Sequence, residues 1–201
     1  LIGESDVVQL DALPVSVTVT ATSNAGIVAV GGAVAVAKGK GLGAAITYNE
    51  VDARVEALVR TTTLEQVAGP ISVHAAFMGQ IVGVAVGVGV SRDTNSTLAL
   101  AGSASVNVIR GTVVARVYDT TVEGVPGSPG ARAPPVTVTA KDASTIVAVA
   151  GAVAGATRGN AVGAAVTYNL IATEVLATIT DASIPEVGDV NVVAESVPVL
   201  V

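Results

Sequence analysis

The sequence predicts an all-β protein, a parallel β-solenoid built from three long repeats and open at both ends. Three observations support this fold class. Branched apolar residues alternate with Ala or Gly over long stretches, which is the period of two that strands show. These stretches recur together with their flanking segments, as they do in proteins that stack repeats. No segment carries a convincing helical stripe of apolar residues, which argues against helical repeats and βαβ units.

Composition limits both the interior and the partners of this protein. The chain has 201 residues, of which 51% are hydrophobic, 13% are charged and 2% are aromatic. Aromatic side chains normally supply much of the buried area of a core. Here Val, Ala and Gly must fill it, so we expect a thin, regular interior. The net charge of −6 argues against nucleic acid and against electrostatic binding to anionic lipid, because both need a basic surface.

Cysteine and histidine are nearly absent, which bears on cofactors. The chain has no Cys and one His, which excludes disulfides and argues against structural zinc. We therefore expect neither a cofactor nor a metal. The uncharged stretch 12–37 is long enough to cross a bilayer as a helix. It contains Thr, Ser, Asn and Pro, however, and many β-branched residues and glycines that disfavour helices. We predict that the chain is not an integral membrane segment.

Each repeat begins with a short alternating segment that ends in alanine. These lead-in segments are 15–21, 71–75, 136–140 and 190–194, and Ala21, Ala75, Ala140 and Ala194 align. The Val residues of the first lead-in face the core in this interpretation, and Thr18 and Thr20 face outward. Thr is common at exposed strand positions, so these rows need no special function.

An apolar run follows each lead-in, at 27–37, 81–90 and 146–156. We predict that each run is a separate strand whose branched residues, Val28 among them, face the core. Ala and Gly would then form an uncharged outward face, a candidate lateral contact between fibres. The simpler interpretation is that another part of the same chain covers this face. Its residues are Ala29, Gly31, Ala33, Ala35, Gly83, Ala85, Gly87, Ala148, Ala150 and Ala152.

A polar turn and a second strand system complete each repeat. The turns contain Gly and Asn, which accept positive φ angles. After each turn comes a segment that ends in Asn49, Asn107 or Asn169, and then an alternating segment. The first of these, 51–59, has one apolar and one charged side, as expected for a strand with one buried face. If a coil takes about 20–30 residues, each repeat makes two to three coils, with the three Asn residues at one corner.

The approximate repeats are 14–69, 70–133 and 134–188, with partial repeats at both ends. We expect them to form a single solenoid segment, 1–201, of a longer protein. A separate antiparallel sandwich for each repeat is the alternative, but units so poor in aromatics would form weak independent cores. The one length variation is predicted to be a loop that bulges from a turn. Its candidate binding residues are Gly124, Pro126, Ser128 and Arg132.

The third repeat shows the sequence rhythm most clearly. It contains Val-Thr-Val-Thr-Ala at 136–140, Ile-Val-Ala-Val-Ala-Gly-Ala-Val-Ala at 146–154 and Gly-Ala-Ala-Val-Thr-Tyr-Asn-Leu-Ile at 163–171. This pattern resembles the repeats of very large bacterial surface proteins, the leukotoxin-like and filamentous-haemagglutinin-like adhesins. The resemblance covers nearly the whole chain. It implies a right-handed parallel β-helix, export to the cell surface or medium, and a role as a fibre or stalk. It carries over no functional residues.

We therefore expect a non-catalytic stalk or filament segment of a large bacterial cell-surface or extracellular adhesin. An adhesive binding module that uses the turn loops is the alternative, and a β-helical polysaccharide-active enzyme is a third hypothesis. His74 replaces a Thr of the other repeats on the outward face, which favours a surface substitution over an acid–base role. The expected partners are neighbouring repeats of the same chain, together with a laterally associated copy or a host-surface target.

Overall fold

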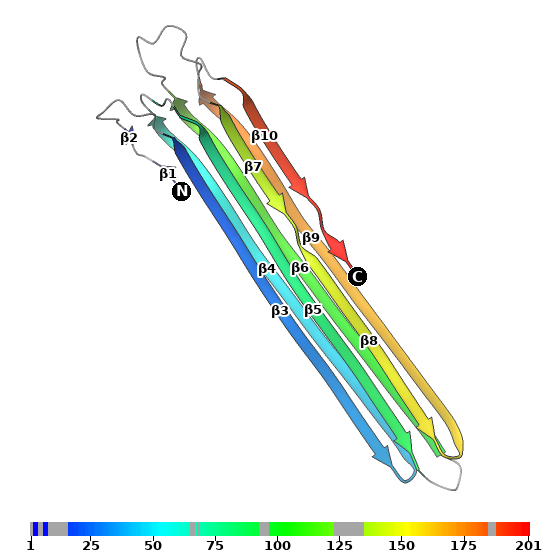
Figure 1. Ribbon diagram of the computed structural model, residues 1–201. Helices are drawn as coiled ribbons and strands as arrows, with labels where there is room; N and C mark the ends of the chain where they lie inside the picture. The colour runs from blue at the N-terminus through cyan, green and yellow to red at the C-terminus, as the bar shows by residue number, and fades with distance from the viewer. Residues whose placement is uncertain are drawn as a thin grey trace, which may run out of the picture.

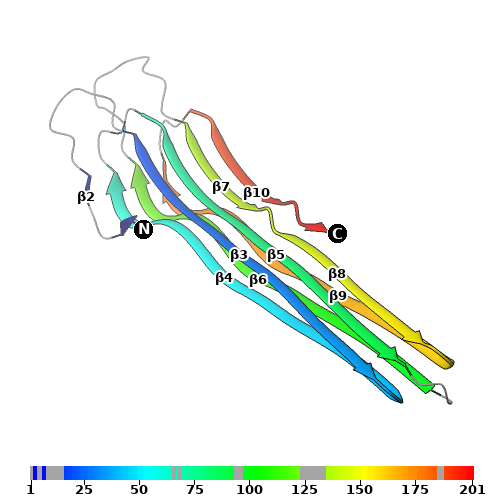
Figure 2. The same cartoon turned by 60° about the horizontal axis from the view of Figure 1, so that its bottom comes forward.

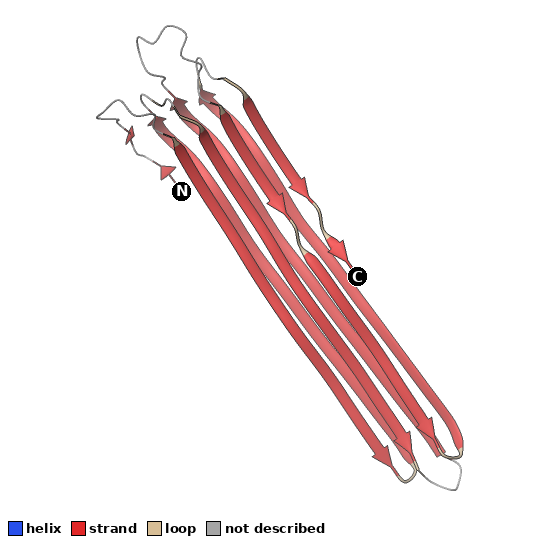
Figure 3. Cartoon of the chain, viewed as in Figure 1, coloured by secondary structure: helices blue, strands red, loops and turns tan. Residues whose placement is uncertain are grey.

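The chain is all-β, with long parallel strands in two sheets (Figures 1 and 3). The computed structural model describes residues 2–3, 6–7, 16–64, 67, 69–92, 97–122, 135–184 and 188–201. One sheet, called the β4 sheet, contains β1 (Ile2–Gly3), β2 (Asp6–Val7), β4 (Lys40–Leu64), β6 (Thr97–Val122) and β9 (Gly159–Ser183). The other, called the β3 sheet, contains β3 (Val17–Ala37), β5 (Ile71–Ser91), β7 (Val136–Asp142), β8 (Thr145–Ala156), β10 (Val190–Ser196) and β11 (Val199–Leu200).

The chain alternates between the two sheets. β3 leads into β4, the chain returns to the β3 sheet as β5, and β6 then lies beside β4. All strand pairs are parallel, and this arrangement is solenoid-like. Each repeat makes one coil, so the expected two to three coils per repeat was wrong. The physical reason is strand length, because β3 and β5 have 21 residues each, β4 has 25 and β6 has 26.

The residues aligned from the sequence are register partners in the ladders. Ala75 pairs with Ala21 on one side and with Ala140 on the other, and Ala140 pairs with Ala194. Asn107 likewise pairs with Asn49 and Asn169. These Asn residues lie within long strands rather than at a corner, which corrects their expected position. Because one repeat is one coil, an Asn is present at this level in each of the three coils.

The direction of the side chains in the apolar runs is the reverse of the prediction. β3 is one continuous strand, so the lead-in and the apolar run do not form two strands. Val17 and Val19 are buried between the sheets, and an uninterrupted strand keeps every second residue on the same face. Ala29 and Gly31 therefore point inward and Val28 and Val30 point outward. The alternation predicted for 51–59 is confirmed, because Val51, Val55, Ala57 and Val59 are buried.

The body has a thick half and a thin half. In the thick half the sheets enclose large side chains. The ring of Phe77 fits over Gly79 and Gly111, where an added Cβ would lie 2.7 Å and 3.2 Å from it. The thin half consists of 27–37, 41–49, 81–91, 99–107, 146–156 and 161–169, next to the turns between β3 and β4 and their equivalents. Its interior contains small residues, except at the border with the thick half, where Ile81 and Ile146 are fully buried. Figure 2 shows the sheets close together here and further apart toward the other end.

The β4 sheet bends at one level in the thick half. Thr61, Asp119 and Asp181 have φ angles of 46°, 49° and 50°, and they occupy equivalent places in β4, β6 and β9. Each adds one residue that switches the alternation, so that Val59 and Leu64 both point inward. Asp tolerates this left-handed conformation better than a β-branched residue such as Thr does. The bend therefore recurs in register through three strands.

The close approach of the sheets in the thin half can be tested with one glycine. A Cβ on Gly87 would overlap the backbone carbonyl oxygen of Gly102 in the opposite sheet. We predict that Gly87→Ala lowers the free energy of unfolding by about 1–3 kcal/mol, the usual cost of overpacking, as measured by urea denaturation. The control is Gly32→Ala on the outer face, where the nearest atom, the carbonyl oxygen of Val86, would be 3.8 Å away. Equal destabilisation by both changes would contradict this explanation.

Candidate functional site

The predicted lateral-contact residues lie between the two sheets, not on the surface. Ala85 is 0% exposed, and the others are buried or half-buried. They fit because the opposite sheet is very near, and a Cβ on Gly83 would lie 2.6 Å from Oδ1 of Asn107. The simpler interpretation, that another part of the same chain covers this face, describes their position. The inward residues are Ala29, Gly31, Ala33, Ala35, Gly83, Ala85, Gly87, Ala148, Ala150 and Ala152.

The outward face of the thin half is apolar on the β3 sheet. Val30 is 78% exposed and Val34 is 74% exposed, and their register partners Val84 and Val88 extend the row across β5. Val149 and Val153 continue it onto β8. The sequence contained a signal for this surface. Had the alternation of the first lead-in been continued through 27–37, the valines would have been placed outside.

The outward face of the β4 sheet is apolar at the same level. Ile46 is 79% exposed on β4, and Leu42 on β4 and Val166 on β9 are also exposed. The two faces lie back to back, since a Cβ on Gly31 would meet the side chain of Thr47. We call the outward apolar residues of both sheets the outer band. Its members with the greatest exposure are Val28, Val30, Val34, Val36, Leu42, Ile46, Val149, Val153, Val162 and Val166.

Polar side chains lie inside the thin half, where they bond to one another. The Asn49 amide nitrogen donates to Oδ1 of Asn107 at 2.8 Å, and the Asn107 amide donates to Oδ1 of Asn169 at 2.9 Å. One level away, the Thr47 hydroxyl donates to Oγ of Ser105 at 2.9 Å. Buried amides and hydroxyls need such partners because desolvation without them is costly. The thin half is thus polar inside and apolar outside.

Polar groups border the outer band at both ends. At the end toward the thick half, the Tyr48 hydroxyl donates to Glu50 at 2.6 Å, and Glu50 also forms an ion pair with Arg110. The hydrogen bond to Glu50 raises the pKa of Tyr48 above its ordinary value, because the neutral phenol is the donor. At the opposite end lie the turns, which carry Lys38, Arg92 and Arg158. On the β4 sheet the band therefore has a tyrosine and carboxylate border, and the turns give it a basic border at the other end.

His74 is the residue for which the sequence raised an acid–base role. His74 is half-buried and pairs in register with Thr20 and Thr139, as the alignment predicted. The buried carboxylate of Asp142 accepts a hydrogen bond from the Ser144 hydroxyl at 2.6 Å. Lys141 pairs with Glu195 at 3.0 Å. Within the described ranges, no group of three or more His, Asp or Glu side chains is placed to hold a metal ion.

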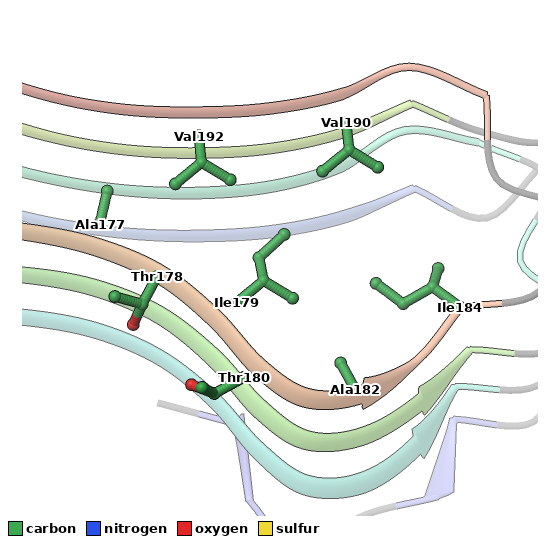
Figure 4. A pocket seen from close by; sticks show the side chains of 8 residues that line it. All are labelled: Ala177, Thr178, Ile179, Thr180, Ala182, Ile184, Val190 and Val192. Carbon is green, nitrogen blue, oxygen red and sulfur yellow. The ribbon is translucent and has the colours of Figure 1, made fainter.

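A cavity of about 550 Å³ lies where the last strands of the two sheets face each other. Figure 4 shows Ile179, Ile184, Val190 and Val192 pointing into it, whereas Thr178 and Thr180 point away. Val192 is 43% exposed, but its register partner Val138, one coil earlier, is 0% exposed. The cavity is thus the uncovered end of the hydrophobic core, and its lining is mostly apolar.

Comparisons with known proteins return no match to a protein-family model, to a curated protein or to a solved structure. In the part of the chain that the structure describes, no helix is both long and apolar enough to cross a membrane. The candidate binding loop, with Gly124, Pro126, Ser128 and Arg132, lies outside the described residues. Adhesion through this loop stays a prediction.

The internal Asn row can be tested at its central member. Asn107→Ala would leave the Asn49 donor and the Asn169 acceptor without their partners. We predict a loss of about 1–3 kcal/mol in the free energy of unfolding, which is the usual cost of unpaired buried polar groups, measured by urea denaturation. The matched control is Asn24→Ala, at an exposed position of β3, which should change the free energy by less than about 0.5 kcal/mol. A negligible effect of Asn107→Ala would show that the row does not stabilise the coil stack.

Proposed function

We propose that this chain is a segment of a right-handed parallel β-solenoid that serves as the stalk or filament of a large bacterial cell-surface or extracellular adhesin. The observation that carries the proposal is the register of successive coils. β4, β6 and β9 match residue for residue over most of their length, and so do β3, β5 and β8. A chain that advances by one strand position per coil has a shape that can be extended by adding repeats.

The uncovered end of the core supports continuation by a further coil. Val190 and Val192 occupy the positions that are fully enclosed at Val136 and Val138 in the previous coil. Another coil placed on β9 and β10 would cover them in the same way. Right-handed connection of parallel strands is the general rule, which supports the handedness of the proposed coil.

The proposed role is structural rather than catalytic. Thr47, Asn49 and Asn107 of the thin half donate hydrogen bonds to the next coil, and the ion pairs Lys141–Glu195 and Arg110–Glu50 also join neighbouring coils. These hydrogen bonds and ion pairs stabilise the stack of coils. The resemblance of the repeats to giant adhesins is the support for the bacterial surface location.

A tandem duplication of residues 14–188 tests the fibre. If the coils continue, electron micrographs should show one particle without a constriction, extended by about 4.8 Å in the direction of stacking for each added coil. The six coils of the duplicated chain stack over only about 29 Å at this spacing, so the strands still run along the longest dimension of the particle and the growth is measured across them.

Two separate particles joined by a linker would contradict the proposal, as would a particle that is no longer in the direction of stacking than the unduplicated chain. The unduplicated chain, imaged under the same conditions, is the control for length. Its extent in the direction of stacking should be smaller by about 4.8 Å for each coil that was added.

A further inference from the structure

The outer band has the polarity of a surface that faces an apolar medium. Valine, leucine and isoleucine side chains cover the outside, while Thr47, Asn49 and Asn107 are enclosed and hydrogen-bonded. A strand in water normally has the opposite arrangement, with apolar residues toward the core. From Val28 to Val36 on β3 and from Leu42 to Tyr48 on β4, no outward residue is charged.

The length of the band matches the apolar layer of a bilayer. At about 3.3 Å per residue, Val28 to Val36 spans roughly 26 Å, and the hydrocarbon layer is about 30 Å thick. The band on the β4 sheet lies at the same level, as the contact between Gly31 and Thr47 requires. The uncharged outward strip on β4, from Leu42 to Tyr48, is shorter than the strip on β3 and spans roughly 20 Å at about 3.3 Å per residue.

The borders of the band match the two polar surfaces of a bilayer. Tyr48 and Tyr168 lie at one level of β4 and β9, are 62% and 56% exposed, and precede the first charged residues of the outer face. Tyrosine is enriched at membrane–water interfaces. The other border carries Lys38, Lys40 and Arg92, and long basic side chains can reach the phosphate level.

We propose that the outer band binds a lipid bilayer, with the thin half in the hydrocarbon layer and the thick half in water. Within the band, the backbones of β5 and β6 are paired on both sides, by β3 and β8 and by β4 and β9. These central strands thus present side chains rather than unpaired backbone groups to lipid, as a hydrocarbon environment requires. The outermost strands would pair with adjoining coils in the fibre proposed above, and to that extent the inference rests on it.

Two features favour lipid over a second copy of the chain. A face-to-face dimer would cover one sheet, whereas the apolar strip is present on both sheets at the same level. A protein interface also has no reason to match the bilayer thickness or to be bordered by tyrosines and basic turns. A bilayer contact through the outward side chains of strands needs neither a membrane-spanning helix nor attraction to anionic lipid, which are the two kinds of contact that the sequence argues against.

Flotation with vesicles of phosphatidylcholine, a zwitterionic lipid, tests the proposal on the purified chain. The unmodified chain should float with the vesicles, and 0.5 M salt should not release it, because the contact is apolar. Val30→Lys combined with Val34→Lys should reduce the bound fraction at least about tenfold, since Lys is strongly disfavoured in hydrocarbon. Both valines are largely exposed, so the variant should keep its fold, which circular dichroism checks.

The matched control is Thr18→Lys combined with Thr20→Lys, on the outward face of the same strand in the thick half. It adds the same charge and should float like the unmodified chain. In a Tyr118→Phe background, lipids brominated near the start of the acyl chain should quench tyrosine fluorescence more than lipids brominated near its end. This result would place Tyr48 and Tyr168 at the interface.

Three results would overturn the proposal. The first is failure of the unmodified chain to float, and the second is equal flotation of the two Lys variants. The third is a dimer in vesicle-free buffer that Val30→Lys and Val34→Lys disrupt, without any flotation, which would assign the band to a second copy. Electron micrographs of the duplicated chain report on the fibre separately, so failure of lipid binding and failure of the fibre are distinguishable.

Discussion

The close approach of the two sheets in the thin half is the constraint on which the other features depend. Opposite Gly83 and Gly87 the sheets leave no room even for a methyl group. The alternating branched residues of the same strands can then be accommodated only on the outside. The large inward side chains, with Phe77 the largest, are found in the thick half and, with Ile81 and Ile146, at its border with the thin half, where the sheets begin to separate. The hydrophobic core and the outer apolar band thus occupy different parts of the same long strands.

Backbone pairing and inward polar rows must contribute much of the order in the thin half, because its interior has little apolar area to bury. A shift of one residue along a strand would turn Asn107 outward and bring Val106 or Val108 between the sheets. The bonded row of Asn residues therefore favours a single register. Hydrogen-bond networks that are fully satisfied can specify a unique arrangement in this way.

The sequence predicted the β structure and the alignment of equivalent residues, since Ala21, Ala75, Ala140 and Ala194 share one ladder. It failed on the facing of the apolar runs, because hydrophobicity alone suggests that valine lies inside and alanine outside. The distance between two sheets is a tertiary property, and no local pattern around Gly31 or Gly87 reports it. Coil length was missed for a related reason, since Thr22 and Asn24 look like a turn between strands but lie within β3. Neither the hydropathy pattern nor any sequence motif predicted that the row of Asn residues would lie between the sheets.

The direction of the Asn row has a consequence for growth. Both hydrogen bonds run the same way, with the amide nitrogen of the earlier coil donating to the carbonyl oxygen of the later one. The parallel ladders have the same directionality, since no strand reverses along the stack. The two ends of such a stack are chemically different surfaces. Continuing the parallel ladders and the Asn row from one stack into the next therefore requires a head-to-tail joint, and a filament assembled in this way has a built-in polarity.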